Sequence, residues 1–232
     1  MKLKLLKFKS VKSTNDKAIK FIQTGKHSSV IIFSENQTKG KGTMGKKWIS
    51  KKGNIFISIF FKVKFTKIKI HNFLIINAKI IKKILQPYIL NTIKIKKPND
   101  LLIKGKKVCG ILQEVIEYNN EKFLVTGIGI NSKVNPNEKN FHSTSLKLHS
   151  DKQINNIHIV GQIKNIYEIF LKAISFLAIR DSLSPFWILL TNFLNSPTDK
   201  PIFSLNSTNL SLISLKSFLN FLNYGHRLLA AR

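Results

Sequence analysis

The chain has 232 residues, of which 43% are hydrophobic, and a formal net charge of +28. This length suits one core domain with a small addition, and the apolar content is ample for a packed interior. Such a positive charge ordinarily indicates a nucleic acid or another anionic surface as the partner. The lysines are spread along the whole chain, however, without a basic tail, a helix-turn-helix signature or zinc-finger spacing. We therefore interpret the charge as compositional bias that still allows weak nonspecific nucleic-acid binding.

Cysteine use and hydropathy argue against secretion and membrane insertion. Cys109 is the only cysteine, which excludes an intrachain disulfide. We interpret Cys109 as a small buried residue, not a catalytic thiol, because no activating histidine lies near it in the sequence. The N-terminal residues alternate in a strand pattern, unlike a signal peptide, and no apolar run reaches the roughly 18 residues of a membrane span. We expect a cytoplasmic protein.

The hydrophobic pattern predicts a mixed order of strands and helices. A first strand at residues 3–8 precedes a helix at 14–24, which Ser13 can cap. The expected strands then fall near residues 29–34, 54–61, 93–95, 100–103, 107–117 and 122–130. Two more helices are expected near residues 72–85 and 155–178.

A loop rich in glycine and lysine follows the second expected strand. From Gln37 to Trp48 it contains three glycines and four lysines. Glycine permits positive φ, so successive N–H groups can point into one concavity, and lysine adds mobile positive charge. The loop alone is equally compatible with a cradle for phosphate or carboxylate and with a basic flexible turn.

Two phosphate-binding motifs overlap this loop, and neither fits. Gly40, Gly42 and Gly45 match G-x-G-x-x-G, but a strand-like run follows, and no acidic residue lies about 20 positions later. The same region imitates a P-loop, yet Lys47 stands where a hydroxyl must ligate magnesium. The loop is therefore neither a dinucleotide-binding loop nor a P-loop.

Further polar segments lie beyond the second predicted helix. Pro98 and Asn99 mark a turn before the strand at 100–103, and Gly105 marks the turn after it. The strand at 122–130 contains two glycines that allow close approach of a ligand or another backbone. Asn131 stands at its exit with an amide that can both donate and accept.

Six of these elements, in order and spacing, resemble those of the biotin protein ligases. They are Ser13-Thr14-Asn15, the loop at 37–45 with Lys41 in place of arginine, residues 96–100, 105–114 and 127–131, and Thr144-Ser145-Leu146. The resemblance covers roughly residues 1–180. It implies an α/β (α+β) fold, a mixed β-sheet with helices packed on one side, as in class II aminoacyl-tRNA synthetases and lipoate ligases.

The resemblance also implies a domain organisation. Residues 1–180 correspond to the biotin ligase catalytic domain. Residues 181–232 lack the glycine-rich strand pattern of the small barrel that usually ends family members. A divergent β-barrel, a frameshifted end and a disordered tail all fit this divergent or degraded C-terminal segment. Because the chain begins close to the first motif, we expect no N-terminal DNA-binding domain, no repressor role and no specific DNA binding.

The activity implied by the resemblance is ATP-dependent conversion of biotin to biotinoyl-5′-AMP, followed by transfer to a lysine of the biotin carboxyl carrier protein of acetyl-CoA carboxylase. Both reactants of the first step are anions and the nucleophile is already ionised, so cations and N–H donors matter more than a general base. Magnesium is expected with ATP, although no acidic cluster in the sequence names protein ligands for it. A homodimer is compatible with the sequence, which does not fix the oligomeric state.

The expected catalytic residues are Lys107, Lys41 and Asp100. Lys107 is expected to reach both the biotin carboxylate and the phosphate. Asp100 either orients a lysine or assists proton loss from the acceptor lysine, or it only bonds N–H groups of its own turn. By resemblance, the biotin ureido ring is expected against Ser13, Thr14, Asn15 and Gln37. The other expected binding residues are Lys41, Gly42, Thr43, Lys107, Gly110, Leu112 and Asn131, the last against the adenylate.

One departure from the family pattern predicts a functional difference. Thr43 stands where the family usually has an arginine that helps to retain the adenylate, so we expect looser retention of biotinoyl-AMP. Two alternatives remain. A lipoate or octanoate ligase shares the fold, but its arginine-rich Ser-Gly-Gly-Gly element is missing from this sequence. A noncatalytic basic nucleic-acid-binding protein would explain the charge but not the six ordered motifs.

Overall fold

The structure, a computed structural model, describes residues 2–63, 70–136 and 142–179. The chain divides into two compact units, one of Leu3–Lys164 and one of Met1–Lys2 with Asn165–Arg232. The strands that the structure describes and the residues of the candidate site lie in the first unit. The predicted C-terminal segment, residues 181–232, lies outside the described residues, so the predicted domain boundary near residue 180 stays a prediction.

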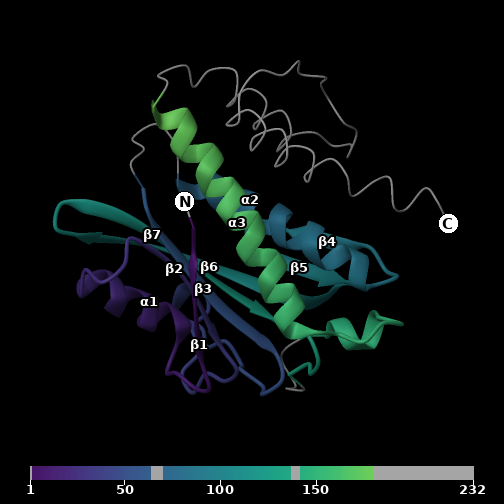
Figure 1. The fold of residues 1–232 in the computed structure, drawn as a ribbon. Coiled ribbons are helices and arrows are strands. Elements are labelled where there is room, and N and C mark those ends of the chain that lie inside the picture. Colours follow the sequence, from purple (N-terminus) through teal and green to yellow (C-terminus); the bar gives the residue numbers. More distant parts are fainter. Residues whose placement is uncertain (1, 64–69, 137–141, 180–232) are drawn as a thin grey trace, which may run out of the picture. The chain divides into compact units, whose positions relative to one another are not determined.

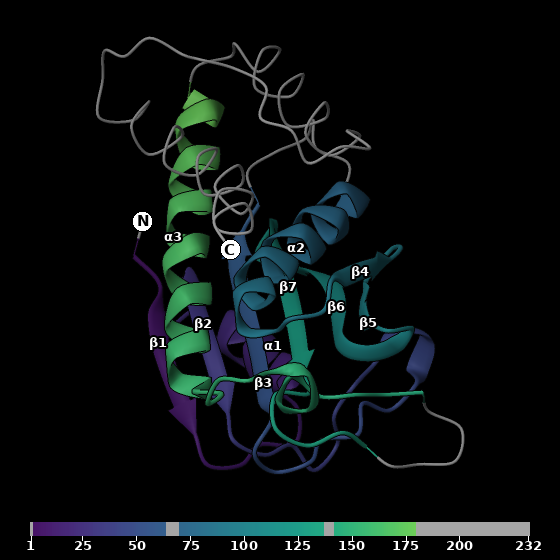
Figure 2. The same cartoon turned by 90° about the vertical axis from the view of Figure 1, so that its right-hand side faces the viewer.

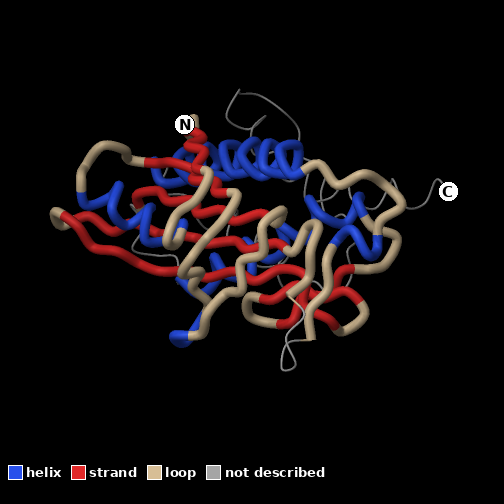
Figure 3. The backbone as a smooth tube through the Cα atoms, turned by 90° about the horizontal axis from the view of Figure 1, so that it is seen from below, coloured by secondary structure: helices blue, strands red, loops and turns tan. Residues whose placement is uncertain are grey.

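A mixed sheet of seven strands is the core of the first unit (Figure 1). Its spatial order is β1-β2-β3-β7-β6-β5-β4, and the strands form one layer, red in Figure 3. The first two strands are parallel and every other pair is antiparallel. The strands are β1 (Lys4–Phe8), β2 (Ser29–Ser34), β3 (Ile55–Lys62), β4 (Ile93–Lys96), β5 (Asp100–Ile103), β6 (Lys106–Tyr118) and β7 (Glu121–Ile130).

Within the described residues, three α-helices and three short 3-10 helices accompany the strands. They are α1 (Thr14–Gln23), η1 (Thr43–Gly45), α2 (Ile70–Leu85), η2 (Gln86–Tyr88), η3 (Leu146–His149) and α3 (Asn156–Ile179). Every strand and α-helix expected from the hydrophobic pattern is present, with ends within two residues of the expected positions. The predicted class, a mixed β-sheet accompanied by helices, is confirmed. In the described parts of the chain, no helix combines the length and apolar character needed to cross a membrane.

Alternation along β3 assigns α1 and α2 to opposite faces of the sheet. Ser58 hydrogen-bonds to residues of α1, whereas the ring centroid of Phe61 lies 6.3 Å from that of Phe73 in α2. Figure 2 shows α1, in purple, behind the strands and α2, in blue, in front of them. The expectation of helices on one side therefore applies to α2 but not to α1, because the apolar face of α1 finds its partners on the opposite face.

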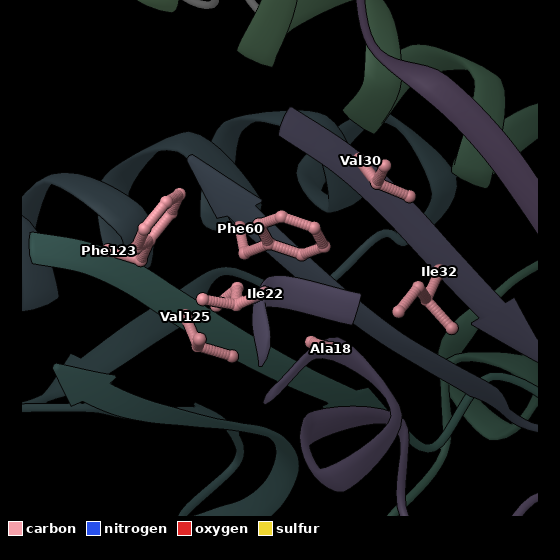
Figure 4. Close-up of a cluster of buried hydrophobic side chains, with 7 residues drawn as sticks. All are labelled: Ala18, Ile22, Val30, Ile32, Phe60, Phe123 and Val125. Atoms are coloured by element: carbon pink, nitrogen blue, oxygen red, sulfur yellow. The ribbon is translucent and has the colours of Figure 1, made fainter. Parts of the chain in front are cut away.

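α1 packs on the sheet through a cluster of buried apolar side chains (Figure 4). Its members are Ala18 and Ile22 from α1 and Val30, Ile32, Phe60, Phe123 and Val125 from the strands. Ser13 caps the helix as predicted, since its hydroxyl accepts from the backbone N–H of Asp16 at 3.4 Å. The cap and the cluster together hold the start of α1 against the middle of the sheet.

Substituting Phe60→Ala should lower the free energy of unfolding by about 3–5 kcal/mol, because Phe60 is fully buried in this cluster and its removal leaves a cavity. Urea denaturation followed by circular dichroism measures the change. Leu90→Ala, at a side chain that is 74% exposed, is the control and should change stability little. Equal stability of the two variants would contradict the packing described here.

Candidate active site

The first turn of α1 and the loop after β2 are joined by hydrogen bonds to one amide. The backbone N–H of Thr14 donates to Gln37 Oε1 at 2.7 Å, and the Thr14 hydroxyl donates to the same oxygen at 3.1 Å. Gln37 Nε2 in turn donates to Ser50 Oγ at 3.1 Å. Because a backbone N–H can only donate, the orientation of the Gln37 amide is fixed.

Asn15 lies on the bare backbone of β7 and links α1 to β3 and β6. Its Nδ2 donates to Glu114 Oε2 at 2.5 Å, and its Oδ1 accepts from the hydroxyl of Ser58. A Cβ on Gly127 would collide with the Asn15 side-chain amide. The predicted role of the strand glycines, close approach, is confirmed at this position, and the approaching group is a side chain of α1.

The glycine-rich loop folds back on itself as a narrow turn. The Gly42 N–H donates to the carbonyl of Lys46 at 2.7 Å, and the Trp48 N–H donates to that of Gly40 at 3.0 Å. Met44 and Gly45 turn the chain at its tip with φ of 55° and 74°. Since the Gly42 N–H is used within the loop, its predicted role in an anion cradle stays a prediction.

Lys41 forms an ion pair with Asp16 in the first turn of α1. The hydrogen bond to Asp16 is the main reason that the pKa of Lys41 is raised, and the charge of Glu114 contributes as well. Both side chains of the ion pair are more than a third exposed, so its contribution to stability is small. The pair links the loop to α1 and favours the charged form of Lys41.

The indole of Trp48 covers two glycines of the central strands. A Cβ on Gly129 would lie 2.7 Å from Trp48 Nε1, and a Cβ on Gly110 would lie 2.7 Å from Cζ3 of the same ring. Trp48 Nε1 is buried and has no hydrogen-bond acceptor in the part of the chain that the structure describes. Trp48 was not among the predicted site residues; the signal for it was an aromatic residue closing a loop opposite strands with glycine on one face.

Lys107 and Asp100 come together beside this indole. Lys107 Nζ lies 2.7 Å from Asp100 Oδ1 and 5.4 Å from the centroid of the Trp48 ring, a cation–π distance. The Lys107–Asp100 contact is an ion pair by distance whose angles do not meet those of a hydrogen bond. This contact is compatible with the expectation that Asp100 orients a lysine, and its expected part in proton loss from the acceptor lysine stays a prediction.

The predicted Thr-Ser-Leu triplet holds the backbone around Lys107 and Asn131. The N–H of Thr144 donates to the carbonyl of Lys107 at 2.9 Å, and the N–H of Leu146 donates to that of Asn131 at 2.8 Å. The Asn131 side chain also donates to the Lys107 carbonyl, at 3.5 Å. Asn131 is therefore placed to support Lys107, and its predicted contact with the adenylate stays a prediction.

His149 contacts Thr144 of the same triplet. Its Nε2 lies 2.8 Å from Thr144 Oγ1 and its Nδ1 lies 3.1 Å from Asn91 Oδ1. Burial, and then the charges of Lys104 and Lys106, lower the pKa of His149. At neutral pH the imidazole is therefore uncharged, with Nδ1–H donating to Asn91 and Nε2 accepting from Thr144.

The remaining predicted binding residues lie near these groups. Gly110 and Leu112 are on β6 with Glu114, on the face that carries α1, because alternate residues of a strand share a face. Thr43 is exposed at the start of η1. No group of three or more His, Cys, Asp or Glu side chains that could hold a metal ion exists within residues 2–63, 70–136 and 142–179.

Comparison with known proteins assigns the family. Residues 7–131, more than half of the chain, match the biotin/lipoate A/B protein ligase family. The chain belongs to this family. It is 28% identical over 164 residues to the bifunctional ligase/repressor BirA of Bacillus spizizenii, covering 68% of this chain and 50% of that protein. It is 30% identical over 122 residues to the biotin–[acetyl-CoA-carboxylase] ligase of Mycobacterium tuberculosis, covering 50% of this chain and 44% of that protein.

Solved structures of family members share the fold of this chain. A biotin protein ligase from Aquifex aeolicus, in complex with biotin and ATP, has a TM-score of 0.59 and 24% identity, covering 70% of this chain and 67% of that chain. The ligase from Leishmania major, in complex with biotinyl-5-AMP, has a TM-score of 0.56 and 23% identity, covering 70% and 71%. The chain spans about half the length of the curated relatives that it matches.

Replacing Gly129→Ala should displace the Trp48 ring and cost about 1–3 kcal/mol of stability through overpacking. The emission of Trp48, isolated by Trp187→Phe because the chain has two tryptophans, should shift to longer wavelength as the indole meets water. Gly161→Ala, where an added Cβ meets nothing within 4 Å, is the control. An unchanged emission maximum in Gly129→Ala would refute this position for the ring.

The thiol of Cys109 should be unreactive in the folded protein. Cys109 is fully buried, and this burial raises its pKa, so the thiolate fraction at pH 8 is smaller than that of a free cysteine. Reaction with Ellman's reagent should be slower by about two orders of magnitude than in urea. Equal rates in the two conditions would contradict the interpretation of Cys109 as a structural residue.

Proposed function

We propose that this chain activates biotin with ATP and transfers the biotinyl group to a lysine of an acceptor protein. The observation that carries the proposal is that Lys107, which contacts Asp100, lies on the same face of the sheet as a polar network. In this network Gln37 bonds to Thr14, Asn15 bonds to Glu114, and Ser58 bonds to both Thr14 and Asn15. The family assignment and the biotin ligases among the relatives support it. The Lys107 ammonium suits a carboxylate and a phosphate as ligands, and the polar network around Asn15 and Gln37 suits a small polar ring.

In the first step, a biotin carboxylate oxygen attacks the α-phosphorus of ATP, and the bond to pyrophosphate breaks. Lys107 would bridge the two anions and stabilise the charge that develops between them. Lys41 would add a second positive charge once the nucleotide competes with Asp16 for it. Gly42, Thr43, Gly110, Leu112 and Asn131 are proposed to surround the biotinoyl-AMP.

In the second step, the acceptor lysine attacks the biotinyl carbonyl carbon, and AMP leaves. The amine must lose a proton, and Asp100, whose Oδ1 lies 2.7 Å from Lys107 Nζ, is the carboxylate that we propose assists. We propose the biotin carboxyl carrier protein of acetyl-CoA carboxylase as the acceptor. Magnesium would enter with ATP, bound mainly by phosphate oxygens and water.

The polar network favours biotin over lipoate as the substrate. A ureido ring offers one carbonyl acceptor and two N–H donors, which match the amides of Asn15 and Gln37 and the hydroxyls of Ser13 and Thr14. A dithiolane ring offers neither a carbonyl acceptor nor an N–H donor, so it could not use the hydrogen-bonding capacity that these amides and hydroxyls retain beside their protein partners. We therefore place lipoate ligation second.

Incorporation of labelled biotin into a purified biotin carboxyl carrier domain should require ATP and Lys107. Lys107→Ala should reduce transfer by about 100-fold or more, because it removes the cation that bridges the two anions. Lys106→Ala, at the exposed neighbouring position, is the matched control and should retain transfer. Labelling by octanoate or lipoate in place of biotin would favour the second candidate. Failure of both transfer and biotin-dependent ATP–pyrophosphate exchange in the unaltered protein would reject ligase activity.

Thr43→Arg should slow the release of biotinoyl-AMP by about tenfold, the scale of one added charge-assisted hydrogen bond. Dissociation of labelled biotinoyl-AMP after a chase with unlabelled compound measures the rate. Thr24→Arg, at an exposed threonine just after α1, controls for the added charge. Identical release from the unaltered protein and Thr43→Arg would show that the loop does not retain the adenylate at this position.

A further inference from the structure

Glu114 contacts Asn15 on the face of the sheet that carries α1. Asn15 Nδ2 donates to Glu114 Oε2 at 2.5 Å, and Asn15 itself is 3% exposed. The acceptor is a carboxylate, so this is a charge-assisted hydrogen bond. The two residues are 99 positions apart, and their contact is made by the pairing of α1 with the sheet.

The carboxylate imposes a direction on the Asn15 amide. An ionised carboxylate only accepts hydrogen bonds, so the NH₂ end of the amide must face Glu114. The Oδ1 end then faces β3, where it accepts from the Ser58 hydroxyl. Gly127 has no Cβ, and an alanine there would collide with this amide. The amide is therefore held in one place and in one orientation. Among the described residues it makes no other hydrogen bond, which leaves one N–H and one lone pair for a ligand.

We propose that Glu114 is a positioning residue that sets the donor and acceptor ends of the Asn15 amide and thereby the recognition of the biotin ureido ring. The proposal rests on the proposed function, since it assigns the ureido ring to this network. Glu114 acts through Asn15 and does not itself contact biotin. If the Asn15 amide were reversed, its NH₂ group would face an N–H of the ureido ring and its oxygen would face the ureido carbonyl, so neither hydrogen bond could form.

The charge of Glu114 also affects Lys41, and the experiment must separate this effect from the orientation of Asn15. Glu114 helps to raise the pKa of Lys41, although the hydrogen bond to Asp16 has the larger effect. Loss of Glu114 therefore alters Lys41 as well as Asn15. Asp16→Asn changes the charge beside Lys41 more strongly and leaves the Asn15–Glu114 hydrogen bond in place, so it isolates the effect through Lys41.

Glu114→Gln is nearly the same size but can donate as well as accept, so it releases the orientation of Asn15. We expect the Kd for biotin, measured by calorimetry, and the KM for biotin in ATP–pyrophosphate exchange to rise about tenfold, with kcat changed much less. Glu117→Gln, on the same strand with an exposed side chain, should leave both values unchanged. Asp16→Asn should leave the biotin Kd unchanged, and a tenfold rise in Asp16→Asn would assign the effect to Lys41 and overturn the proposal.

A double variant separates orientation from structural support. Combining Asn15→Asp with Glu114→Gln restores a hydrogen bond between the two positions with donor and acceptor exchanged. We expect the Tm to return toward that of the unaltered protein. The affinity for biotin should stay as weak as in Glu114→Gln, or become weaker. Recovery of biotin binding along with the Tm, or unaltered binding in Glu114→Gln alone, would overturn the proposal. If the unaltered protein binds no biotin, the proposed function itself is wrong, and this result is distinct from either outcome with the Glu114 variants.

Discussion

Three glycines on two adjacent strands leave the sheet backbone uncovered, and the candidate site depends on the side chains that lie against it. An added Cβ at Gly127 would collide with Asn15, and one at Gly110 or Gly129 would collide with Trp48. α1 and the glycine-rich loop can therefore approach the sheet more closely than packed side chains would allow. This close approach brings groups from distant parts of the sequence within hydrogen-bonding distance.

Negative charge is scarce in this chain, and three of its carboxylates lie at the site. Of 11 acidic residues against 39 basic ones, Asp16, Asp100 and Glu114 each contact a residue of the proposed machinery. Asp16 and Asp100 pair with lysines, whereas Glu114 pairs with a neutral amide. Each of these three carboxylates thus contacts a group that it can orient, and the interpretation of the excess positive charge as compositional bias stays a hypothesis.

The order and bounds of the elements could be predicted because each strand and helix has a clear hydrophobic period and turn residues at its ends. The side-chain contacts between these elements could not be predicted. Ser13 was expected as a helix cap and Cys109 as a buried residue, and both follow from local chemistry. The pairing of Lys41 with Asp16, the position of Trp48 and the contact of Asn15 with Glu114 depend on which face of the sheet α1 covers, and no local pattern contains that choice.

The Asn15–Glu114 contact also constrains the order in which the site can form. β1, α1 and β2 lie within the first 34 residues and can associate early, because their contacts close short loops. Glu114 enters only when β6 joins β7, 99 positions beyond Asn15. A nascent chain that has formed the β1–α1–β2 unit already contains the Ser-Thr-Asn motif but lacks the carboxylate that orients Asn15. Competence to recognise a ligand is therefore acquired late in folding, with closure of the sheet.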